Sequence, residues 1–335
     1  MKTNKITPLI TALLAVMFTA CAQTNTSKEK KQATEMRPID KLYNNIQPLQ
    51  YKSMPQYFIE ANQSGCFYEL YVNGRLVFNL FKQVGLMGNI TCINDAILKS
   101  GKQEVTVKLY PLGQTKVKRF DTFTKNARIE VKIEKYDIQV EDSDEKVVTF
   151  KIPEASTRSK NDIKIEGLPY YEHTFTFYAE VPYEVTGWSE SQDLTKMDQK
   201  QLEKEIVAFY NNLSDVIYNQ DEAKWVDLVK NREQEVLISE AYNDVNEESI
   251  KDRKRKFKQV FDSKFKKKEP LDKYEMIFGG NGRIVALKGL VKKGYGAFSN
   301  GYEEVTRDGR KRKIRNYEYI YLHKPKGSNK LEIIR

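Results

Sequence analysis

Clustered lysine and arginine side chains are the feature of this sequence that most clearly predicts an interaction. Residues 251–335 hold 25 Lys and Arg against 10 Asp and Glu, a net charge of +15, whereas the rest of the chain carries −5. Concentrated positive charge attracts acidic proteins and anionic surfaces. The densest runs supply the candidate partner-binding residues Lys254, Arg255, Lys256, Lys258, Arg310, Lys311, Arg312 and Lys313.

Several explanations compete for this positive charge. An acidic protein and an anionic membrane surface fit equally well, the latter at about 1 kcal/mol for each basic residue held near it. Nucleic acid is attracted by the same charge, but the cell-envelope location argued below makes it a partner that we do not expect. A basic run on a helix is also typical of a solvated face, and that alternative stays open.

Aromatic residues offer a second candidate site. Tyr170, Tyr171 and Trp188 could stack on the rings of a sugar beside carboxylate or amide groups. Packing at the edge of a core explains the same three residues. Glycan binding is therefore the alternative to protein binding.

Catalytic and metal-binding patterns are missing from the sequence. The two histidines are His173 and His323, and no HExxH, paired CxxC, GxSxG or Walker A motif occurs. The glycine group at 279–282 predicts a hairpin turn without the helix that a phosphate site needs. We therefore expect no catalytic residue, metal or cofactor. A hydrolase that uses a pair of carboxylates is the less favoured alternative, because any acid-rich chain offers such pairs.

The N-terminus has the composition of a secretory signal. Two lysines precede an apolar run at 6–18, and small residues follow. A run of that length is too short to span the roughly 30 Å of bilayer hydrocarbon. The sequence thus predicts a signal peptide over residues 1–20. Residues 21–44 are polar and poor in apolar side chains, which predicts an unstructured tether.

Residues 18–21, Phe-Thr-Ala-Cys, resemble the lipobox of bacterial lipoproteins, in the form found in Bacteroidota. The resemblance implies that Cys21 becomes the acylated first residue of the mature chain, with palmitate among its acyl groups. Two or more acyl chains anchor a protein firmly to a membrane. Ala22 follows the cysteine in place of the Asp that marks inner-membrane retention, so the resemblance implies the outer membrane, in either leaflet.

Cys66 and Cys92 are the two remaining cysteines. An oxidising envelope compartment favours a disulfide between them. It would close a loop of about 27 residues and stabilise the fold by about 3–4 kcal/mol in the chain-entropy model. Two buried thiols are the alternative.

Strand patterns dominate residues 45–187. Apolar residues alternate at Val105, Val107 and Leu109, and Asn73-Gly74 separates two apolar runs. These patterns predict half-buried strands and a type I′ hairpin, and together an antiparallel β-sandwich domain. The stretch from YVNGRLV to INDAILKSGKQEVTVKLYP resembles galactose-binding-like and immunoglobulin-like sandwiches.

Helical periodicity replaces alternation in residues 190–335. Apolar stripes predict helices over about 197–220, from Asp221, and from about 246 to Pro270. Hairpin signals follow at 281–282 and 308–309, so we expect an α+β domain with about three helices on an antiparallel sheet. The stretch AFYNNLSDVIYNQDEAKWVDLVKNRE resembles the opening helices of the nuclear transport factor two-like superfamily.

These observations predict a non-catalytic, lipid-anchored protein of the cell envelope. Its basic second domain would hold an acidic protein partner, as an interaction or immunity-type lipoprotein does. The alternative is a glycan-binding accessory lipoprotein that uses the sandwich. The two interpretations place the binding site in different halves of the chain, so side-chain placement can separate them.

Overall fold

The computed structural model describes residues 36–44, 51–82, 87–239, 247–263, 266–271, 273–306 and 308–335. The predicted signal peptide at 1–20 and the predicted lipid attachment at Cys21 lie outside the described residues. None of the helices in those ranges combines the length with the apolar character that a bilayer span needs.

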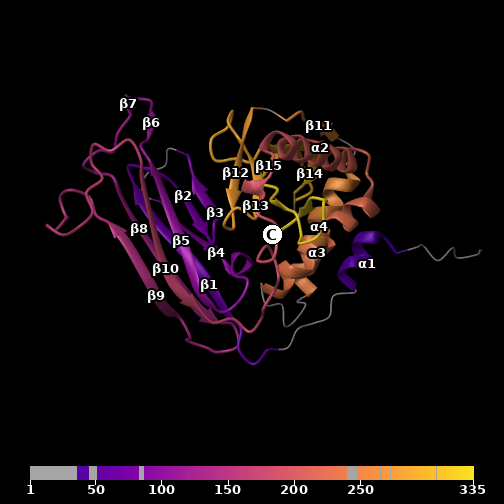
Figure 1. Cartoon of the computed structure of the whole chain (residues 1–335), viewed down its shortest axis with the longest axis horizontal. Coiled ribbons are helices and arrows are strands. Elements are labelled where there is room, and N and C mark those ends of the chain that lie inside the picture. The colour runs from indigo at the N-terminus through magenta and orange to yellow at the C-terminus, as the bar shows by residue number, and fades with distance from the viewer. Residues whose placement is uncertain are drawn as a thin grey trace, which may run out of the picture. The chain divides into compact units, whose positions relative to one another are not determined.

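Antiparallel strands make up most of the first half of the described chain (Figure 1). They pair in two four-stranded sheets, of order β4-β1-β8-β9 and β10-β5-β2-β3, and in the short ribbon β6-β7. The strands are β1 (Pro55–Ser64), β2 (Phe67–Val72), β3 (Arg75–Leu80), β4 (Met87–Cys92), β5 (Gly101–Tyr110), β6 (Gly113–Gln114), β7 (Arg119–Phe120), β8 (Arg128–Asp137), β9 (Glu145–Ile152) and β10 (Tyr171–Ala179).

Alternating apolar residues form one hydrophobic core from both four-stranded sheets. Val105 and Val107 of β5 and Val131 and Ile133 of β8 are fully buried in the same cluster. Burying each such side chain stabilises the fold by about 1.5–3 kcal/mol. Residues 73 and 74 connect β2 to β3 with φ of 50° and 77°, the positive values that a type I′ turn requires. The predicted hairpin is confirmed.

Helices lie mainly in the second half of the chain, where they precede most of its strands. The helices are α2 (Gln199–Tyr218), α3 (Glu222–Ser239) and α4 (Glu247–Asp262), with short 3₁₀ turns η1 (Asn94–Ala96) and η2 (Leu194–Lys196) before them. The strands are β11 (Lys266–Lys268), β12 (Tyr274–Gly279), β13 (Ile284–Gly289), β14 (Phe298–Val305), β15 (Lys311–Glu318), β16 (Leu322–His323) and β17 (Glu332–Ile333). They form the sheets β11-β14-β15 and β12-β13-β16-β17.

Helix α2 anchors this half through one buried face. The Asp198 side chain caps its N-terminus by accepting a hydrogen bond from the backbone N–H of Gln201. Leu202 and Ile206, four residues apart, are buried on the inner face. The Tyr210 hydroxyl donates to the carbonyl of Ile320 at 2.6 Å, which ties the helix to the chain that follows β15.

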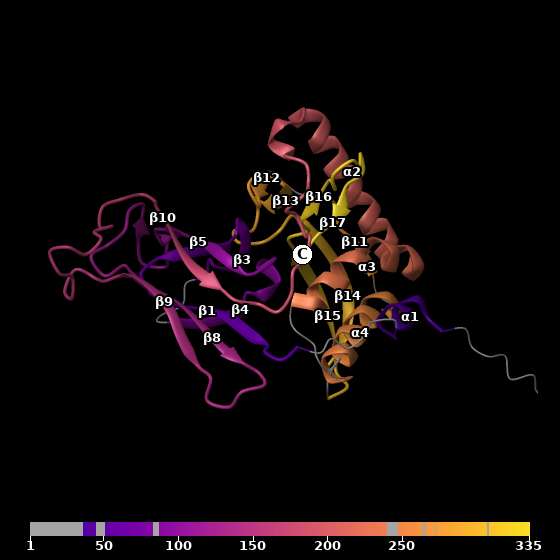
Figure 2. The same ribbon diagram turned by 60° about the horizontal axis from the view of Figure 1, so that its bottom comes forward.

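A short helix, α1 (Pro38–Asn44), corrects the predicted tether. Ile39 and Tyr43 are 1% and 2% exposed and pack in a cluster with Leu237 of α3 and Phe261 of α4. Both views show α1 beside these helices (Figures 1 and 2). The tether prediction is wrong for 38–44, because two apolar residues four apart are enough to make one buried helical face. Residues 21–35 lie outside the described residues.

Contacts join the two halves of residues 37–335, which form one compact unit. Lys288 of β13 pairs with the buried Glu69 of β2 at 2.9 Å. The β2–β3 turn lies against the β12–β13 turn so closely that a Cβ on Gly74 would be 2.6 Å from the amide nitrogen of Gly280. The division into domains at 45–187 and 190–335 stays a prediction.

Candidate functional site

Helix α4 places most of the predicted basic site because its faces differ in character. Ile250, Phe257 and Phe261 turn toward the cluster that holds α1, and the Trp225 ring of α3 packs against Phe257 and Phe261 with centroids 5.6 and 5.8 Å away. These apolar contacts fix the rotation of the helix about its axis. The lysines and arginines between them are left on its other faces.

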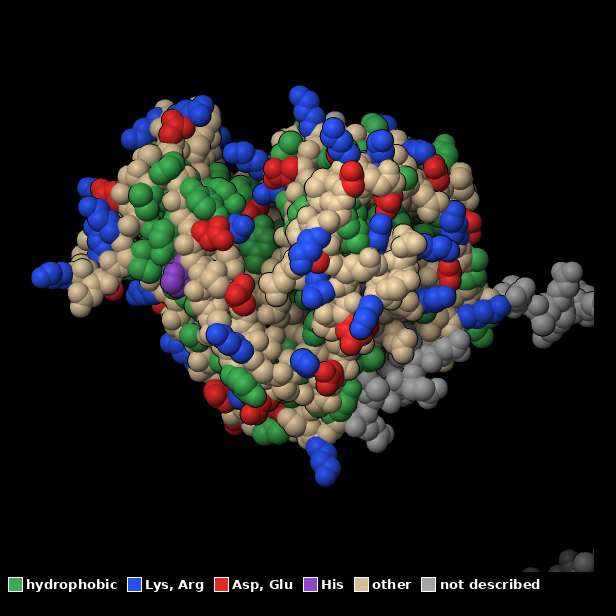
Figure 3. Space-filling view, viewed as in Figure 1, with side chains coloured by type: hydrophobic (Ala, Val, Ile, Leu, Met, Phe, Trp, Pro, Cys, Tyr) green, Lys and Arg blue, Asp and Glu red, His purple; other side chains and the backbone are tan. Residues whose placement is uncertain are grey.

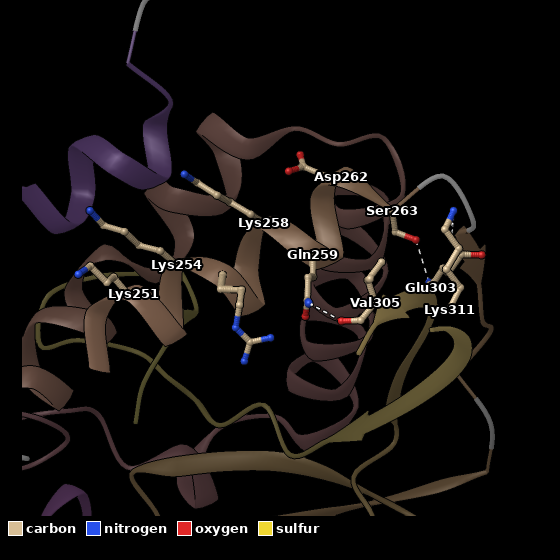
Figure 4. Close-up of a pocket in the computed structure, with 10 residues that line it drawn as sticks. Lys251, Lys254, Lys258, Gln259, Asp262, Ser263, Glu303, Val305 and Lys311 are labelled. Carbon is tan, nitrogen blue, oxygen red and sulfur yellow. Dashed lines mark hydrogen bonds and ion pairs between the residues drawn. The ribbon is translucent and has the colours of Figure 1, made fainter. Parts of the chain in front are cut away.

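A groove of about 560 Å³ runs between α4 and the β14–β15 hairpin (Figure 4). Four of the eight predicted partner-binding residues line it, namely Lys254, Arg255, Lys258 and Lys311. Lys251 adds a fifth cation, while Asp262 and Glu303 are the acidic side chains of the lining. The described lining therefore has more positive than negative groups.

Two hydrogen bonds hold the hairpin against the helix and so define the groove. The Gln259 side-chain amide donates to the carbonyl of Val305 at 3.3 Å. The backbone N–H of Glu303 donates to the Ser263 hydroxyl at 2.8 Å. Figure 4 shows both bonds at the hairpin side, while Lys251, Lys254 and Lys258 point the other way, toward α1.

The groove's cations share their carboxylate partners. Asp40 of α1 lies 2.9 Å from the Lys258 ammonium and 3.9 Å from that of Lys254. Asp252 pairs with both Arg255 and Lys256, and their hydrogen bonds lower its pKa to about 2. One carboxylate between two cations leaves a net positive charge both around Asp40 and around Asp252. Sequence reasoning missed the role of Asp40, since nothing local predicts that this residue meets α4.

The other predicted basic residues lie outside the described lining of the groove. Lys256 is exposed on α4 outside the groove, and Arg310, Arg312 and Lys313 are exposed near the tip of the β14–β15 hairpin. Arg310 pairs with Asp308 at 2.7 Å and Arg312 with Glu304 at 2.6 Å. Figure 3 shows acidic side chains beside many of the basic ones on the visible face, as such pairs require. Exposed pairs of this kind contribute only about 0.2–1 kcal/mol each.

The predicted aromatic site is not assembled. Tyr170 is 39% exposed, but Trp188 is 4% exposed and buried in a cluster with Ile284 and Tyr321. Tyr171 begins β10, whereas Trp188 follows the end of that strand. Trp188 lines the same cavity as Thr176, which is five residues and about 16 Å along β10 from Tyr171, so the three rings do not form one sugar platform.

The predicted disulfide is wrong: Cys66 and Cys92 are not joined. Cys92 pairs with Phe58 in the middle of β1, while Cys66 follows Ser64 at the end of that strand. Six residues along a strand span about 20 Å, far beyond the roughly 7 Å between Cα atoms that a disulfide allows. Instead, the Cys66 thiol faces the carbonyl of Arg128 at 3.6 Å, and burial raises its pKa to about 12.

The described residues hold no group of three His, Cys, Asp or Glu side chains that could bind a metal. His323 is 7% exposed, and its Nδ1 lies 2.7 Å from the Ser191 hydroxyl. Burial lowers its pKa to about 4, which keeps the ring neutral at pH 7. These contacts are those of a packed core histidine.

Comparisons with protein-family models, with curated proteins and with solved structures find no match for this chain.

Proposed function

We propose that this protein is a lipid-anchored protein of the bacterial cell envelope that binds an acidic protein partner in the groove beside α4. In this proposal a β-sandwich domain over 45–187 precedes a basic α+β domain over 190–335. The lipobox resemblance at Cys21 supports the anchor and the outer membrane. The observation that supports the binding site is the gathering of Lys254, Arg255, Lys258 and Lys311 around one groove.

Helix α1 supports the choice of an acidic peptide as the occupant. Asp40 already places a helical carboxylate against Lys254 and Lys258 at the groove's edge. Arg255 and Lys311 lie elsewhere along the same groove. Among the residues that the structure describes, Arg255 pairs with Asp252 and Lys311 with Glu303, one carboxylate for each. An acidic segment bound there would add carboxylates next to partly exposed cations.

A charge-reversal experiment tests the groove. The double variant Arg255→Glu and Lys311→Glu leaves the two lysines that hold Asp40 in place. Exposed Lys160 and Lys164, changed to Glu together, give a control with the same net charge. Binding of a fluorescein-labelled poly-glutamate peptide is followed by anisotropy. We expect the groove variant to bind about tenfold more weakly than the control, which corresponds to about 1.4 kcal/mol. Equal affinities of the two variants would refute the groove as the site.

The anchor has its own test. Cells that express the protein are labelled with an alkynyl palmitate analogue, and the Cys21→Ser variant serves as the control. We expect label on the wild-type chain and none on the variant. An unlabelled wild-type chain that still carries residues 1–20 by intact mass would end the lipoprotein proposal.

A further inference from the structure

A second cavity, of about 530 Å³, lies on the other side of α4 from the lysines that meet α1. Its described walls come from α3 and α4, from β14 and β15, and from residues 319–321 and 333–335. Proteins bind small molecules in cavities of about 300–1,000 Å³ that are mostly apolar and carry a few polar groups. The volume falls within that range.

Apolar side chains line this cavity from opposite walls. Val229 of α3 and Phe257 and Val260 of α4 contribute from the helices, and Ile320 and Ile333 contribute from the strand side. About half of the lining is apolar and the rest is polar or charged, so the cavity suits a ligand that has both an apolar body and a charged group.

The charged part of the lining is mainly cationic. Arg232 and Arg253 both pair with Glu233, whose side chain is 0% exposed and lies behind them, outside the lining. Burial alone would raise the pKa of Glu233, but the charges of Arg232 and Arg253 outweigh it and lower that pKa. Two guanidinium groups on one carboxylate leave one positive charge that faces the cavity.

Hydrogen-bond donors in the wall also lack partners. Trp225 Nε1 and the Tyr319 hydroxyl are buried and have no hydrogen-bond partner among the described residues. Buried donors in native proteins are nearly always paired, so each unpaired one calls for an explanation. An oxygen atom of a bound molecule could accept a hydrogen bond from either donor after a small shift of the cavity wall.

We propose that this cavity binds an amphiphile with an apolar body and an anionic head, such as a medium-chain carboxylate, with its head at Arg232 and Arg253. The lining holds two carboxylates: Glu304, which pairs with Arg312 at 2.6 Å, and Glu318, which accepts a hydrogen bond from the Asn316 amide at 3.1 Å. Six Lys and Arg side chains of the same lining outnumber them. The cavity shares Arg255 and Gln259 with the groove proposed above for a protein partner, but Arg232 and Arg253 lie outside the lining of that groove, so the two proposals are tested by different variants.

Calorimetric titration of the full chain with decanoate and with decanol tests this assignment. Arg253→Gln removes one guanidinium, Lys164→Gln is the charge-matched control on an exposed loop, and Val260→Phe fills the cavity from a half-buried position. We expect decanoate to bind more tightly than decanol. Arg253→Gln should weaken decanoate about tenfold, as the loss of a charge-assisted hydrogen bond does, and should leave decanol unchanged. Val260→Phe should weaken both ligands.

Three results would overturn the proposal. The first is no binding of decanoate, the second is decanol binding as tightly as decanoate, and the third is Arg253→Gln behaving like Lys164→Gln. Circular dichroism checks that each variant is folded. If Arg253→Gln does not fold, the ratio of decanoate to decanol affinity in the wild-type chain still decides between an anionic site and a purely apolar one.

Discussion

Replacing Glu233 with glutamine, which has nearly the same shape, should lower the free energy of unfolding strongly. Its side chain has no exposed surface and contacts Arg232, Arg253 and the Tyr43 hydroxyl, the last at 2.8 Å. The two arginines hold the pKa of Glu233 below its usual value in spite of burial, so the carboxylate is ionised at pH 7. Glu233→Gln removes that charge and leaves two guanidinium groups side by side.

The size of the loss follows from how buried the partners are. Removing one member of a buried ion pair costs about 3–5 kcal/mol. Arg232 and Arg253 keep 31% and 22% of their side-chain surface exposed, and water will partly solvate their charges. We therefore expect a loss of about 2–3 kcal/mol in the free energy of unfolding.

Urea unfolding followed by circular dichroism measures this loss. The slope of the free energy of unfolding against urea concentration should stay unchanged, which shows that the unfolded state is the same in both chains. Asp227→Asn is the control, because it lies on the same helix, pairs with Lys230 and is 71% exposed. It should change stability by less than about 0.5 kcal/mol. A Glu233→Gln variant as stable as Asp227→Asn would refute our account of the cluster.

Three further predictions concern other parts of the chain. His323 has its pKa lowered to about 4 by burial, so the unfolded chain, with an ordinary pKa of about 6.5, takes up the proton first as the pH falls. The free energy of unfolding should be highest above about pH 6.5 and fall by up to about 3 kcal/mol toward pH 4. Urea titrations at each pH should show a weaker pH dependence for His323→Gln. Cys66 and Cys92 are not joined, so a reducing agent should leave the melting temperature unchanged. Alkylation of the unreduced, unfolded Cys21→Ser chain should modify both cysteines, and a chain in which neither cysteine is alkylated would show a disulfide. Ile39 is 1% exposed, so Ile39→Ala should cost about 2–4 kcal/mol and speed hydrogen exchange over 38–44, whereas equal exchange rates would show that the α1 contacts do not hold that helix.

Local patterns predicted the strands and turns because their causes are local. Alternation at Val105, Val107 and Leu109 decides which face of β5 is buried, whatever the strand pairs with. The Asn73-Gly74 turn needs only two residues that accept positive φ. Mostly antiparallel sheets in the first half and helices mainly in the second were predictable for the same reason.

Long-range pairing decided the predictions that failed. The distance between the two cysteines depends on which residue of β1 stands opposite Cys92, and spacing along the chain does not encode that register. Trp188 is buried by contacts with Gly280 and Arg335, far away in sequence. The ion pair of Lys258 with Asp40 joins residues 218 positions apart. Sequence composition shows the cations but not the carboxylates that meet them.

Shared carboxylates explain how so basic a segment folds, and they predict an uncommon response to salt. Asp40, Asp252 and Glu233 each contact two cations, so close attraction stabilises each group while like charges still repel one another at longer range. The Debye length falls from about 30 Å at 0.01 M to about 3 Å at 1 M salt, which screens distant repulsion more than contact pairs. We therefore expect the melting temperature to rise with sodium chloride concentration. A steady fall would mean that isolated surface pairs, and not shared ones, dominate the electrostatics of residues 251–335.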